Sequence, residues 1–562
     1  MNAVRENIEK NLRFIVTAQK MISCFRRQSH FEAFDLAKEA INQMDSIITE
    51  LSQKKDNMFA SDIFNFPYIM EMLSNLLVAQ ERKDYILLAD LYEIQVIPHF
   101  IKIQENLCSL EELTWNDIQY KKNSKMLQGK YPKLSELLRT QKQPVQLHNQ
   151  EYMVEYTSSG AITLATVLPE GKKYMHSNYI PQCEANDIAT GWYDRDKNQY
   201  AILGLGMGYH VHALAEMSEY ISIKVYESDI AMIQIACAYS QAWEVLCQPN
   251  VEIIYEPDEK VLLQKLFKNN KHTMIGIHYP TMIKLKNKEV RESLEDFFIQ
   301  DDAYKRYRYA LDGNFMANVA RDYETIDVLE SKFRGKSLYI VAAGPSLDKN
   351  FMELKKVGEN GVILATGTVF RKLVNAGIYP DYVIGIDATK LIHRQIEGLE
   401  NLNIPLIGLS TVYKSFMQDY SGEKYIVYQS GYKKAEQVAK EKGYKLYQTG
   451  GSVSTLALDI GIHFTCKKVI FLGLDLAYPN GMKHATGTDF VDVMNTEFMD
   501  EIEDIYGNLV YTSKNMNIYR KWIEQRIKQI NNIEFIDATE GGAKIAGMKI
   551  LKMTEVIRDK VS

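Results

Sequence analysis

The chain has 562 residues, of which 46% are hydrophobic and 25% charged, and its formal net charge is -6. A chain of this length exceeds what one hydrophobic core supports, so we expect three or four domains. The slightly negative net charge excludes a positive electrostatic potential over the whole surface and argues against extended nucleic-acid binding. No uncharged apolar run is long enough to cross a bilayer, so we expect no membrane span.

The six cysteines are scattered, without a Cys-x-x-Cys pair and without histidines at zinc-site spacing. This distribution predicts neither a disulfide framework nor a metal centre and favours a reducing, cytoplasmic setting. The first twenty residues mix charges into their apolar positions, which is unlike a secretory signal peptide.

Residues 1–112 show helical periodicity. Apolar residues recur at three- and four-residue steps in "HFEAFDLAKEAINQMDSIITELSQ" and again in "YIMEMLSNLLVAQERKDYILLADLYEIQVIPHFIKIQENL". This spacing predicts a helical bundle. Because the segment holds no cluster of catalytic residue types, we interpret it as a module for packing or for docking a partner.

Residues 113–300 begin with a charged, helical stretch, "WNDIQYKKNSKMLQGKYPKLSELL". It leads into three short strand-like segments, "EYMVEYTSS", "AITLATVLPEG" and "KKYMHSN", which predict a small hairpin layer. Strand and helix patterns then alternate through "QYAILGLGMGYHVHALAEM", "SIKVYESD", "VEIIYEPD" and "HTMIGIHYP". Such βα units predict a parallel sheet with helices on both faces, a Rossmann-like domain.

A glycine-rich turn follows the first strand of that domain. Gly204, Gly206 and Gly208 come directly after "QYAIL", and Glu227 closes the next strand. This spacing suits a nucleotide site, since glycines let a ligand approach the backbone and the carboxylate can accept from ribose hydroxyls. The alternative is a tight turn that needs glycine in a domain without a ligand.

Residues 301–515 contain a second set of βα units, and the pattern of residues 516–562 predicts a terminal helix followed by a strand.

In "YIVAAGPSLDKN" a buried strand leads into Gly344, Pro345 and Ser346 and then into a helix. Glycine, proline and a capping serine are common at such a connection, so capping alone explains them. Alternatively, free amides at the helix start receive a phosphate.

Small hydroxyl residues, glycines, two aspartates and a histidine recur at the following strand ends. They are Thr366, Gly367, Thr368, Asp387, Ser410, Thr411, Thr449, Gly450, Gly451, Ser452, Asp475, Lys483 and His484. Open parallel sheets bind ligands at the carboxyl ends of their strands, so this recurrence predicts one nucleotide-phosphate pocket.

The pocket offers three candidate catalytic residues. His484 can act as a general base or stabilise a leaving phosphate, or be an ordinary loop histidine. Asp387 and Asp475 can bind a metal or a ribose, or cap a helix. No Asp-x-Asp motif accompanies them, so the sequence does not demand a metal.

Several of these motifs, in this order, resemble the motility accessory factor (Maf) family over residues 115–550: "GKSLYIVAAGPSLDKN", "GVILATGTVFRKLVNAGIYPDYVIGIDAT", "TGGSVSTLALDIGIHFTCKKVIFLGLDLAY" and "DATEGGAKIAG". The resemblance implies a glycosyltransferase that moves pseudaminic or legionaminic acid, both nonulosonic acids, from a CMP-activated donor to Ser or Thr of flagellin. It further implies a sialyltransferase-like central domain whose donor pocket includes residues 344–346 and 449–452. Ala343 departs from that pattern, which usually has Asn before Gly-Pro-Ser.

The central domain also resembles the 6-hydroxymethylpterin diphosphokinase MptE-like family. That resemblance implies a diphosphotransferase using ATP and Mg²⁺, with Asp387 and Asp475 as metal ligands. A third hypothesis is a flagellin-binding, chaperone-like module whose nucleotide fold is inactive.

Overall fold

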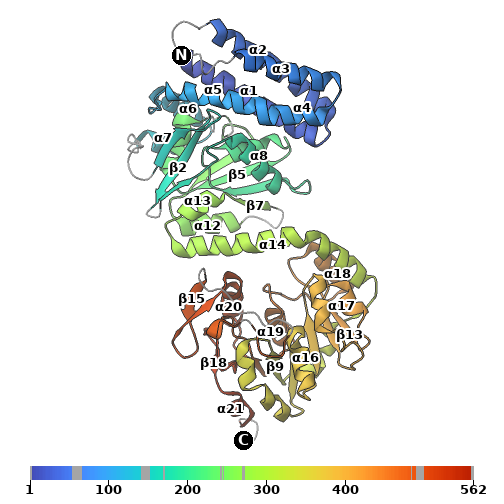
Figure 1. The fold of residues 1–562 in the computed structure, drawn as a ribbon. Helices are drawn as coiled ribbons and strands as arrows, with labels where there is room; N and C mark the ends of the chain where they lie inside the picture. The colour runs from blue at the N-terminus through green and yellow to red at the C-terminus, as the bar shows by residue number, and fades with distance from the viewer. Residues whose placement is uncertain are drawn as a thin grey trace. The chain divides into compact units, whose positions relative to one another are not determined.

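The computed structural model describes residues 3–53, 66–140, 152–168, 171–240, 244, 246–268, 273–482, 484–488 and 499–558. The chain divides into two units, Met1–Glu295 and Asp296–Ser562, which we describe one at a time (Figure 1). Both combine helices with parallel sheets, which confirms the predicted α/β class.

The first unit begins with the predicted helical bundle. Its helices are α1 (Ala3–Arg26), α2 (His30–Gln53), α3 (Phe66–Glu81), α4 (Tyr85–Leu91) and α5 (Ile97–Ser109), with a π-helical turn, η1 (Tyr92–Val96), before α5. The apolar positions of these helices meet in one core, where the ring centres of Phe14 and Phe100 lie 4.4 Å apart. The amphipathic periodicity therefore packs as expected.

A small antiparallel sheet and a four-stranded parallel sheet complete the first unit. The antiparallel strands are β1 (Tyr152–Tyr156), β2 (Ile162–Leu168) and β3 (Gly171–Tyr174). The parallel sheet has the order β6-β5-β4-β7, with β4 (Gln199–Leu203), β5 (Ser222–Glu227), β6 (Val251–Tyr255) and β7 (Thr273–Ile277). Its described helices are α6 (Asp117–Leu127), α7 (Pro132–Thr140), α8 (Pro181–Trp192), α9 (Tyr209–Glu216), α10 (Ile230–Tyr239), α12 (Glu259–Phe267) and α13 (Tyr279–Lys284).

The second unit is built on a nine-stranded sheet in which all neighbours are parallel. Its order is β18-β17-β14-β9-β10-β11-β12-β13-β8. The strands are β8 (Glu324–Thr325), β9 (Ser337–Val341), β10 (Gly361–Thr366), β11 (Tyr382–Gly385), β12 (Leu406–Leu409), β13 (Lys424–Val427), β14 (Lys468–Leu472), β17 (Glu534–Asp537) and β18 (Lys549–Ile550). Strands β10 to β13 follow β9 on one side of it, and β14 and β17 follow on its other side. The strand order therefore reverses between β9 and β14, and doubly wound sheets bind ligands at such a reversal point.

Helical segments cover both faces of this sheet. The longer ones are α14 (Lys288–Val319), α16 (Gly367–Asn375), α17 (Lys414–Gln418), α18 (Lys433–Lys442), α19 (Val453–His463), α20 (Lys514–Ile527) and α21 (Met553–Arg558). The short ones are α15 (Glu330–Phe333) and the 3₁₀ segments η2 (Ile326–Leu329), η3 (Pro345–Lys349), η4 (Phe351–Lys356), η5 (Lys390–Gln395) and η6 (Pro479–Gly481). The unit boundary falls within α14.

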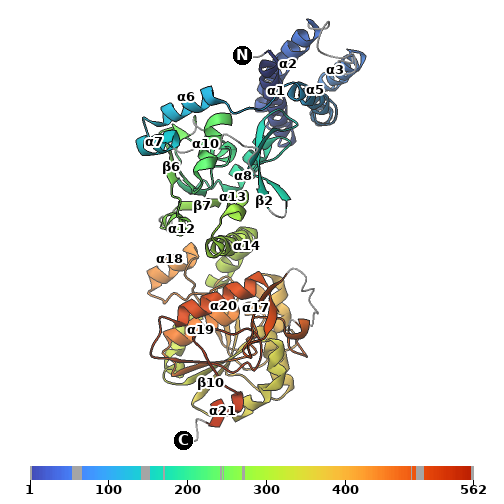
Figure 2. The ribbon, with the colours of Figure 1, turned by 90° about the vertical axis from the view of Figure 1, so that its left-hand side faces the viewer.

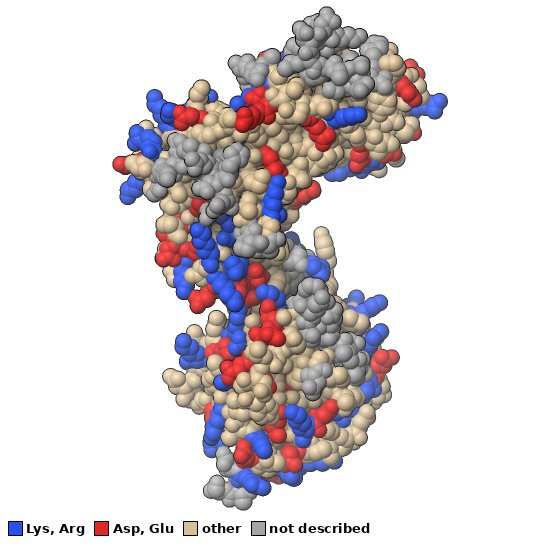
Figure 3. All heavy atoms as spheres, turned by 60° about the vertical axis from the view of Figure 1, so that its left-hand side comes forward, with Lys and Arg blue, Asp and Glu red and all other residues tan. Residues whose placement is uncertain are grey.

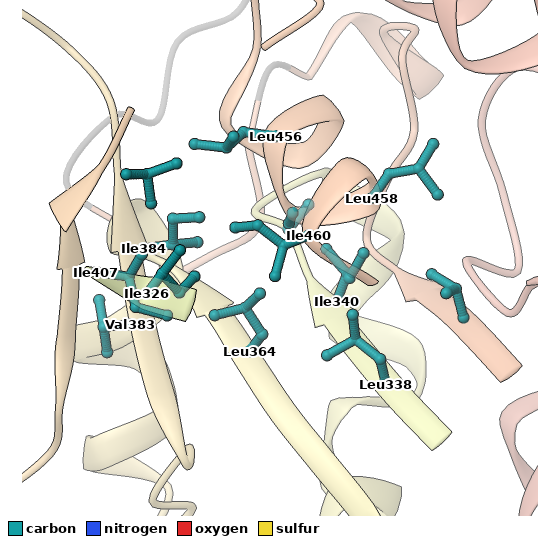
Figure 4. Close-up of a cluster of buried hydrophobic side chains, with 14 of the residues drawn as sticks. Ile326, Leu338, Ile340, Leu364, Val383, Ile384, Ile407, Leu456, Leu458 and Ile460 are labelled. Atoms are coloured by element: carbon teal, nitrogen blue, oxygen red, sulfur yellow. The ribbon is translucent and has the colours of Figure 1, made fainter. Parts of the chain in front are cut away.

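The central strands are buried on both faces, which explains their unbroken apolar sequences. Leu338 and Ile340 of β9 pack with α19 and α20, whereas Tyr339 and Val341 pack with α16 and α21 on the other face. Figure 2 shows α19 and α20 on one side of the sheet and α21 on the other. The first of these cores is shown in Figure 4, where Leu338 and Ile340 lie below Ile460 of α19.

The C-terminal segment belongs to the same sheet, because β17 pairs with β14 and β18 pairs with β17. A two-stranded antiparallel hairpin, β15 (Asp500–Glu503) and β16 (Leu509–Thr512), precedes α20. On the face of the second unit seen in Figure 3, acidic and basic side chains are interspersed without a large area of one charge. Among the described residues, no helix is both long and apolar enough for a membrane crossing.

Candidate active site

The predicted site residues of the second unit follow strands that are neighbours in one parallel sheet. Strands β14, β9, β10, β11 and β12 are consecutive, so their carboxyl ends form one edge. The strand ends that carry the predicted site residues therefore lie side by side at one edge of the sheet.

Ser346 and Asp475 meet at this edge. The Ser346 hydroxyl donates to Asp475 Oδ1 at 2.5 Å, and the Ser346 backbone N–H donates to Asp475 Oδ2 at 3.2 Å. Both residues are buried, with 3% and 2% of their surface exposed. The expected free amide for a phosphate is thus wrong at Ser346, because a carboxylate of the chain itself already accepts that N–H.

Gly344 is required for close approach rather than for an unusual backbone angle. Its φ is -66°, a value open to any residue. A Cβ at Gly344 would lie 2.0 Å from Asp475 Oδ2 and 2.5 Å from the carbonyl oxygen of Gly473. Pro345 begins the 3₁₀ helix η3, a first-turn position that suits proline.

The segment around Asp475 has a constrained backbone. Leu476 has a φ of 45°, a left-handed conformation that is rare for a branched side chain, and Gly473 has a φ of 63°. The carbonyl oxygen of Asp475 accepts from Ala543 N at 2.7 Å. Backbone held in such regions clusters at functional sites, so this geometry marks the segment as a candidate.

Asp537 is a second buried carboxylate at the same edge, and we did not select it from the sequence. Its Oδ1 accepts from Thr539 N at 3.0 Å, while Oδ2 has no hydrogen-bond partner among the described residues. Burial raises the pKa of Asp537 to about 6. Burial also raises the pKa of Asp475 to about 6, and the charge of Asp537 contributes to that rise while the bonds from Ser346 oppose it.

The sequence did contain a signal for Asp537. "IEFIDATEGG" has an aspartate at the end of a buried strand, the same pattern that led us to Asp387 and Asp475. The structure places this strand, β17, next to β14, and the register pairs Phe471 with Asp537. The local pattern alone does not show that this C-terminal segment continues the second set of βα units, and for that reason the sequence did not single out Asp537.

The loop after Asp537 is tied to the helix that begins at Pro345. Lys349 Nζ donates to the carbonyl oxygen of Glu540 at 2.7 Å, and Asn350 Nδ2 donates to Ala538 O at 2.7 Å. Glu540 itself has a left-handed φ of 59°. The 537–542 loop and the 344–350 segment therefore form one connected wall around the carboxylates.

His484 lies in a segment that contacts the same wall. The neighbouring Ala485 N donates to Ala343 O at 2.8 Å, and Thr486 N donates to Asp348 Oδ2 at 3.0 Å. The His484 side chain is half-buried. Lys483 lies outside the described residues, so its expected role stays a prediction.

The predicted hydroxyl residues on β10 and β12 are used by local bonds. Thr368 Oγ1 accepts from Gln395 Nε2 at 3.0 Å. A Cβ at Gly367 would clash with the same Gln395 side chain. Thr366 is the residue directly before α16. The Ser410 hydroxyl donates to Gln429 Oε1 at 2.6 Å, and Gln429 Nε2 donates to Thr411 Oγ1 at 3.0 Å. These groups lie on the predicted edge, but the bonds they make are structural ones.

The "TGGS" segment, residues 449–452, packs against α20. Ser452 caps α19 through a capping box with Thr455, which confirms the expected helix start. Gly450 and Gly451 have positive φ values of 55° and 89°, and a Cβ on either would meet Trp522 or Tyr519 of α20. A ligand at this loop would therefore lie beside aromatic rings.

Asp387 stands apart from the carboxylate pair. It is exposed, and its Oδ1 accepts from Thr389 N at 2.8 Å, a short turn within its own loop. Of the alternatives open from the sequence, this bond matches local capping. A role in catalysis or metal binding stays a prediction.

In the first unit, side chains of the chain itself occupy the glycine-rich turn. A Cβ at Gly204 would lie 2.3 Å from Thr281 Oγ1, and one at Gly206 would lie 2.4 Å from His176 Nε2; Gly208 precedes α9 with a φ of 82°.

Both Glu227 oxygens accept backbone N–H groups, from residues 205, 228 and 229. Burial raises the pKa of Glu227 to about 7. These bonds are not those expected for a ribose carboxylate, and nucleotide binding at this turn stays a prediction.

A groove of about 620 Å³ lies at the opposite edge of the nine-stranded sheet. It is lined by residues at the amino ends of β10 and β11, together with Lys332, Lys336 and Lys355. Ligands of open α/β sheets bind outside the carboxyl ends of the strands. We therefore assign the candidate active site to the carboxylate edge and not to this groove.

Two comparisons with known proteins give a match. A family model described as "6-hydroxymethylpterin diphosphokinase MptE-like" matches residues 313–481, which include Ser346 and Asp475 but not Asp537. A solved structure, the MAf glycosyltransferase from Magnetospirillum magneticum AMB-1, is similar with a TM-score of 0.40 and 14% identity, over 79% of this chain and 77% of that chain. Curated proteins give no match.

Proposed function

We propose that the second unit is a cytoplasmic group-transfer enzyme with a nucleotide-activated donor, and that it transfers a nonulosonic acid from CMP to Ser or Thr of flagellin. The observation that supports a transferase is the buried pair Asp475 and Asp537 beside Ser346, at the sheet edge where such folds bind ligands. The donor and acceptor come from the sequence resemblance to the Maf family.

In this reaction the acceptor hydroxyl oxygen forms a bond to the anomeric carbon while the bond from that carbon to the CMP phosphate breaks. CMP leaves with the electron pair, and the acceptor proton passes to a protein base. We assign that base to Asp537, because its Oδ2 has no partner among the described residues. A pKa of about 6 keeps the carboxylate mostly ionised at pH 7 and makes it a stronger base than an ordinary aspartate.

Asp475 has a different part in this proposal. Both of its oxygens already accept from Ser346, so it holds the Gly-Pro-Ser segment in place against the strand ends. We assign to His484, on the adjoining loop, the stabilisation of charge on the leaving phosphate. No step in this scheme requires a metal.

A second candidate function is diphosphate transfer from ATP with Mg²⁺, favoured by the family match to residues 313–481. Thermal-shift titration of the full chain with CMP and with ATP, each with and without Mg²⁺, separates the two. Stabilisation by CMP without Mg²⁺ supports the glycosyltransferase, and stabilisation only by ATP with Mg²⁺ supports the diphosphotransferase. No shift with either supports the inactive flagellin-binding module.

The decisive experiment is co-expression with flagellin and the enzymes that make the CMP-activated sugar, read by intact mass. We expect flagellin to gain the mass of the sugar with the wild-type chain and not with Asp537→Asn. Asp322→Asn is the matched control, since the Asp322 side chain is 90% exposed. Unmodified flagellin in the presence of wild-type chain and donor would refute the proposal.

A further inference from the structure

Three buried histidines lie together behind the glycine-rich turn of the first unit. His176 follows β3, His210 lies in the first turn of α9, and His278 follows β7. Each has at most 1% of its surface exposed. One ring nitrogen from each lies within 4.8 Å of the other two. Residues more than thirty positions apart in the sequence thus form one cluster.

Two of the imidazoles bond an oxygen atom through one ring nitrogen. His210 Nε2 is 3.0 Å from Gly204 O, and His278 Nδ1 is 2.9 Å from Thr281 Oγ1. His176 Nδ1 faces a carboxylate oxygen of Glu184 at 3.8 Å, which is too long for a hydrogen bond. Metal-bound histidines almost always use their second nitrogen in this way, which fixes the tautomer and the ring orientation.

The other nitrogens are the potential ligands. By interatomic geometry, His176 Nδ1, His210 Nδ1 and His278 Nε2 are buried and have no hydrogen-bond partner among the described residues, although the Met175 backbone is a hydrogen-bonding neighbour of the His278 ring. Buried polar atoms are rarely left in this state, so these nitrogens call for an explanation. His176 Nε2 accepts a hydrogen bond from Met207 N at 2.9 Å, and it would have to give up this bond in order to coordinate an ion.

We propose that His176, His210 and His278 form a binding site for one zinc ion. Three imidazoles and a water molecule satisfy the tetrahedral coordination of Zn²⁺, whose bonds to nitrogen measure about 2.0–2.1 Å and place the ring centres roughly 5 Å apart. The ring centres here lie 4.4, 4.9 and 5.5 Å apart. The planes of His210 and His278 differ by only 10°, so binding of one ion by both rings requires one of them to rotate.

The ion would join the connection after β3, the start of α9 and the connection after β7, three segments that surround the glycine-rich turn. This site lies in the first unit and does not depend on the transfer reaction proposed for the second.

The test uses the full chain after removal of metals with a chelator. We expect the protein to take up one equivalent of Zn²⁺ by elemental analysis and to gain several degrees in melting temperature. Co²⁺, used as a spectroscopic probe, should give the intense visible absorption of a tetrahedral site with nitrogen ligands. Uptake below about a tenth of an equivalent, or no such absorption, would overturn the proposal.

Variants assign the ligands. His210→Ala and His278→Gln should each weaken Zn²⁺ binding by at least about 100-fold, since loss even of an outer-shell partner costs 10–100-fold. The control is His212→Ala, which removes an exposed histidine from the same helix. Glu184→Gln changes only an outer contact and supplies a milder test if a ligand variant does not fold. Binding equal to wild type in the folded ligand variants would overturn the site.

Discussion

Replacing Asp537 by Asn should change the pH dependence of stability in a defined direction. The pKa of Asp537 is about 6 in the folded chain, against an ordinary value of 3.8, because the carboxyl group is buried. The folded chain therefore binds more protons than the unfolded chain between these values. The contribution of Asp537 to stability is complete below pH 3.8 and is lost as the pH rises through 6. Asn cannot ionise, so the variant avoids that loss.

The size of the effect follows from the same two pKa values. A difference of roughly two units corresponds to about 3 kcal/mol, which the Asp537→Asn variant gains relative to the wild-type chain between pH 4 and pH 7. The Asn side chain keeps the acceptor for Thr539 N, and its amide nitrogen replaces the oxygen that has no described partner. Any cost of that nitrogen is the same at every pH and leaves the slope unchanged.

The assay is calorimetry of the wild-type chain, Asp537→Asn and Asp322→Asn from pH 4.5 to pH 7.5. About 2 of these 3 kcal/mol develop between pH 4.5 and pH 7.5. We therefore expect the melting temperature of Asp537→Asn minus that of wild type to rise with pH by roughly 4–8 °C, at about 2–4 °C per kcal/mol for a unit of this size. The difference for Asp322→Asn should stay constant. A constant or falling difference for Asp537→Asn would refute the argument that burial raises this pKa.

Three further variants test the contacts around the site. Ser346→Ala removes a hydroxyl donor from Asp475 and should cost about 1.5–3 kcal/mol at pH 7.5 but less at pH 5, where the carboxyl group is protonated, as read from melting temperatures at both values. Gly344→Ala places a methyl group against the Asp475 carboxylate and should lower the melting temperature and abolish any stabilisation by CMP. Arg526→Met leaves Asp459 buried without its guanidinium partner and should cost about 3–5 kcal/mol by denaturant unfolding.

Each of these has a matched comparison. Ser421→Ala removes an exposed hydroxyl that donates to a carbonyl, so its small effect should not depend on pH. Gly358→Ala adds a methyl group where nothing lies within 4 Å and should leave both stability and CMP response intact. Restoration of stability to Arg526→Met by adding Asp459→Asn would attribute the loss to the Asp459 charge, which keeps, among the described residues, only His463 as an ion-pair partner in the single variant. If a variant and its matched comparison lose the same amount of stability, the contact removed in that variant does not contribute as argued.

The sequence alone determined the helical bundle, the two sets of βα units and the edge of the second sheet where polar residues gather. These features follow from local rules, because hydrophobic spacing sets the element type and parallel strands present their carboxyl ends at one edge. Ser452 shows the same: a capping residue beside its own helix needs no information from elsewhere in the chain.

Only the tertiary structure decided which of those residues touch. Ser346 bonds to Asp475 across 129 positions, and this bond turns an apparently free helix start into a carboxylate contact. Asp537 reaches the same edge because β17 pairs with β14, and the histidine cluster exists because three distant loops converge. Pairing of distant segments is set by packing of whole sheets and helices, which no local pattern encodes. The sequence therefore located the edge of the sheet, and the fold selected the carboxylates within it.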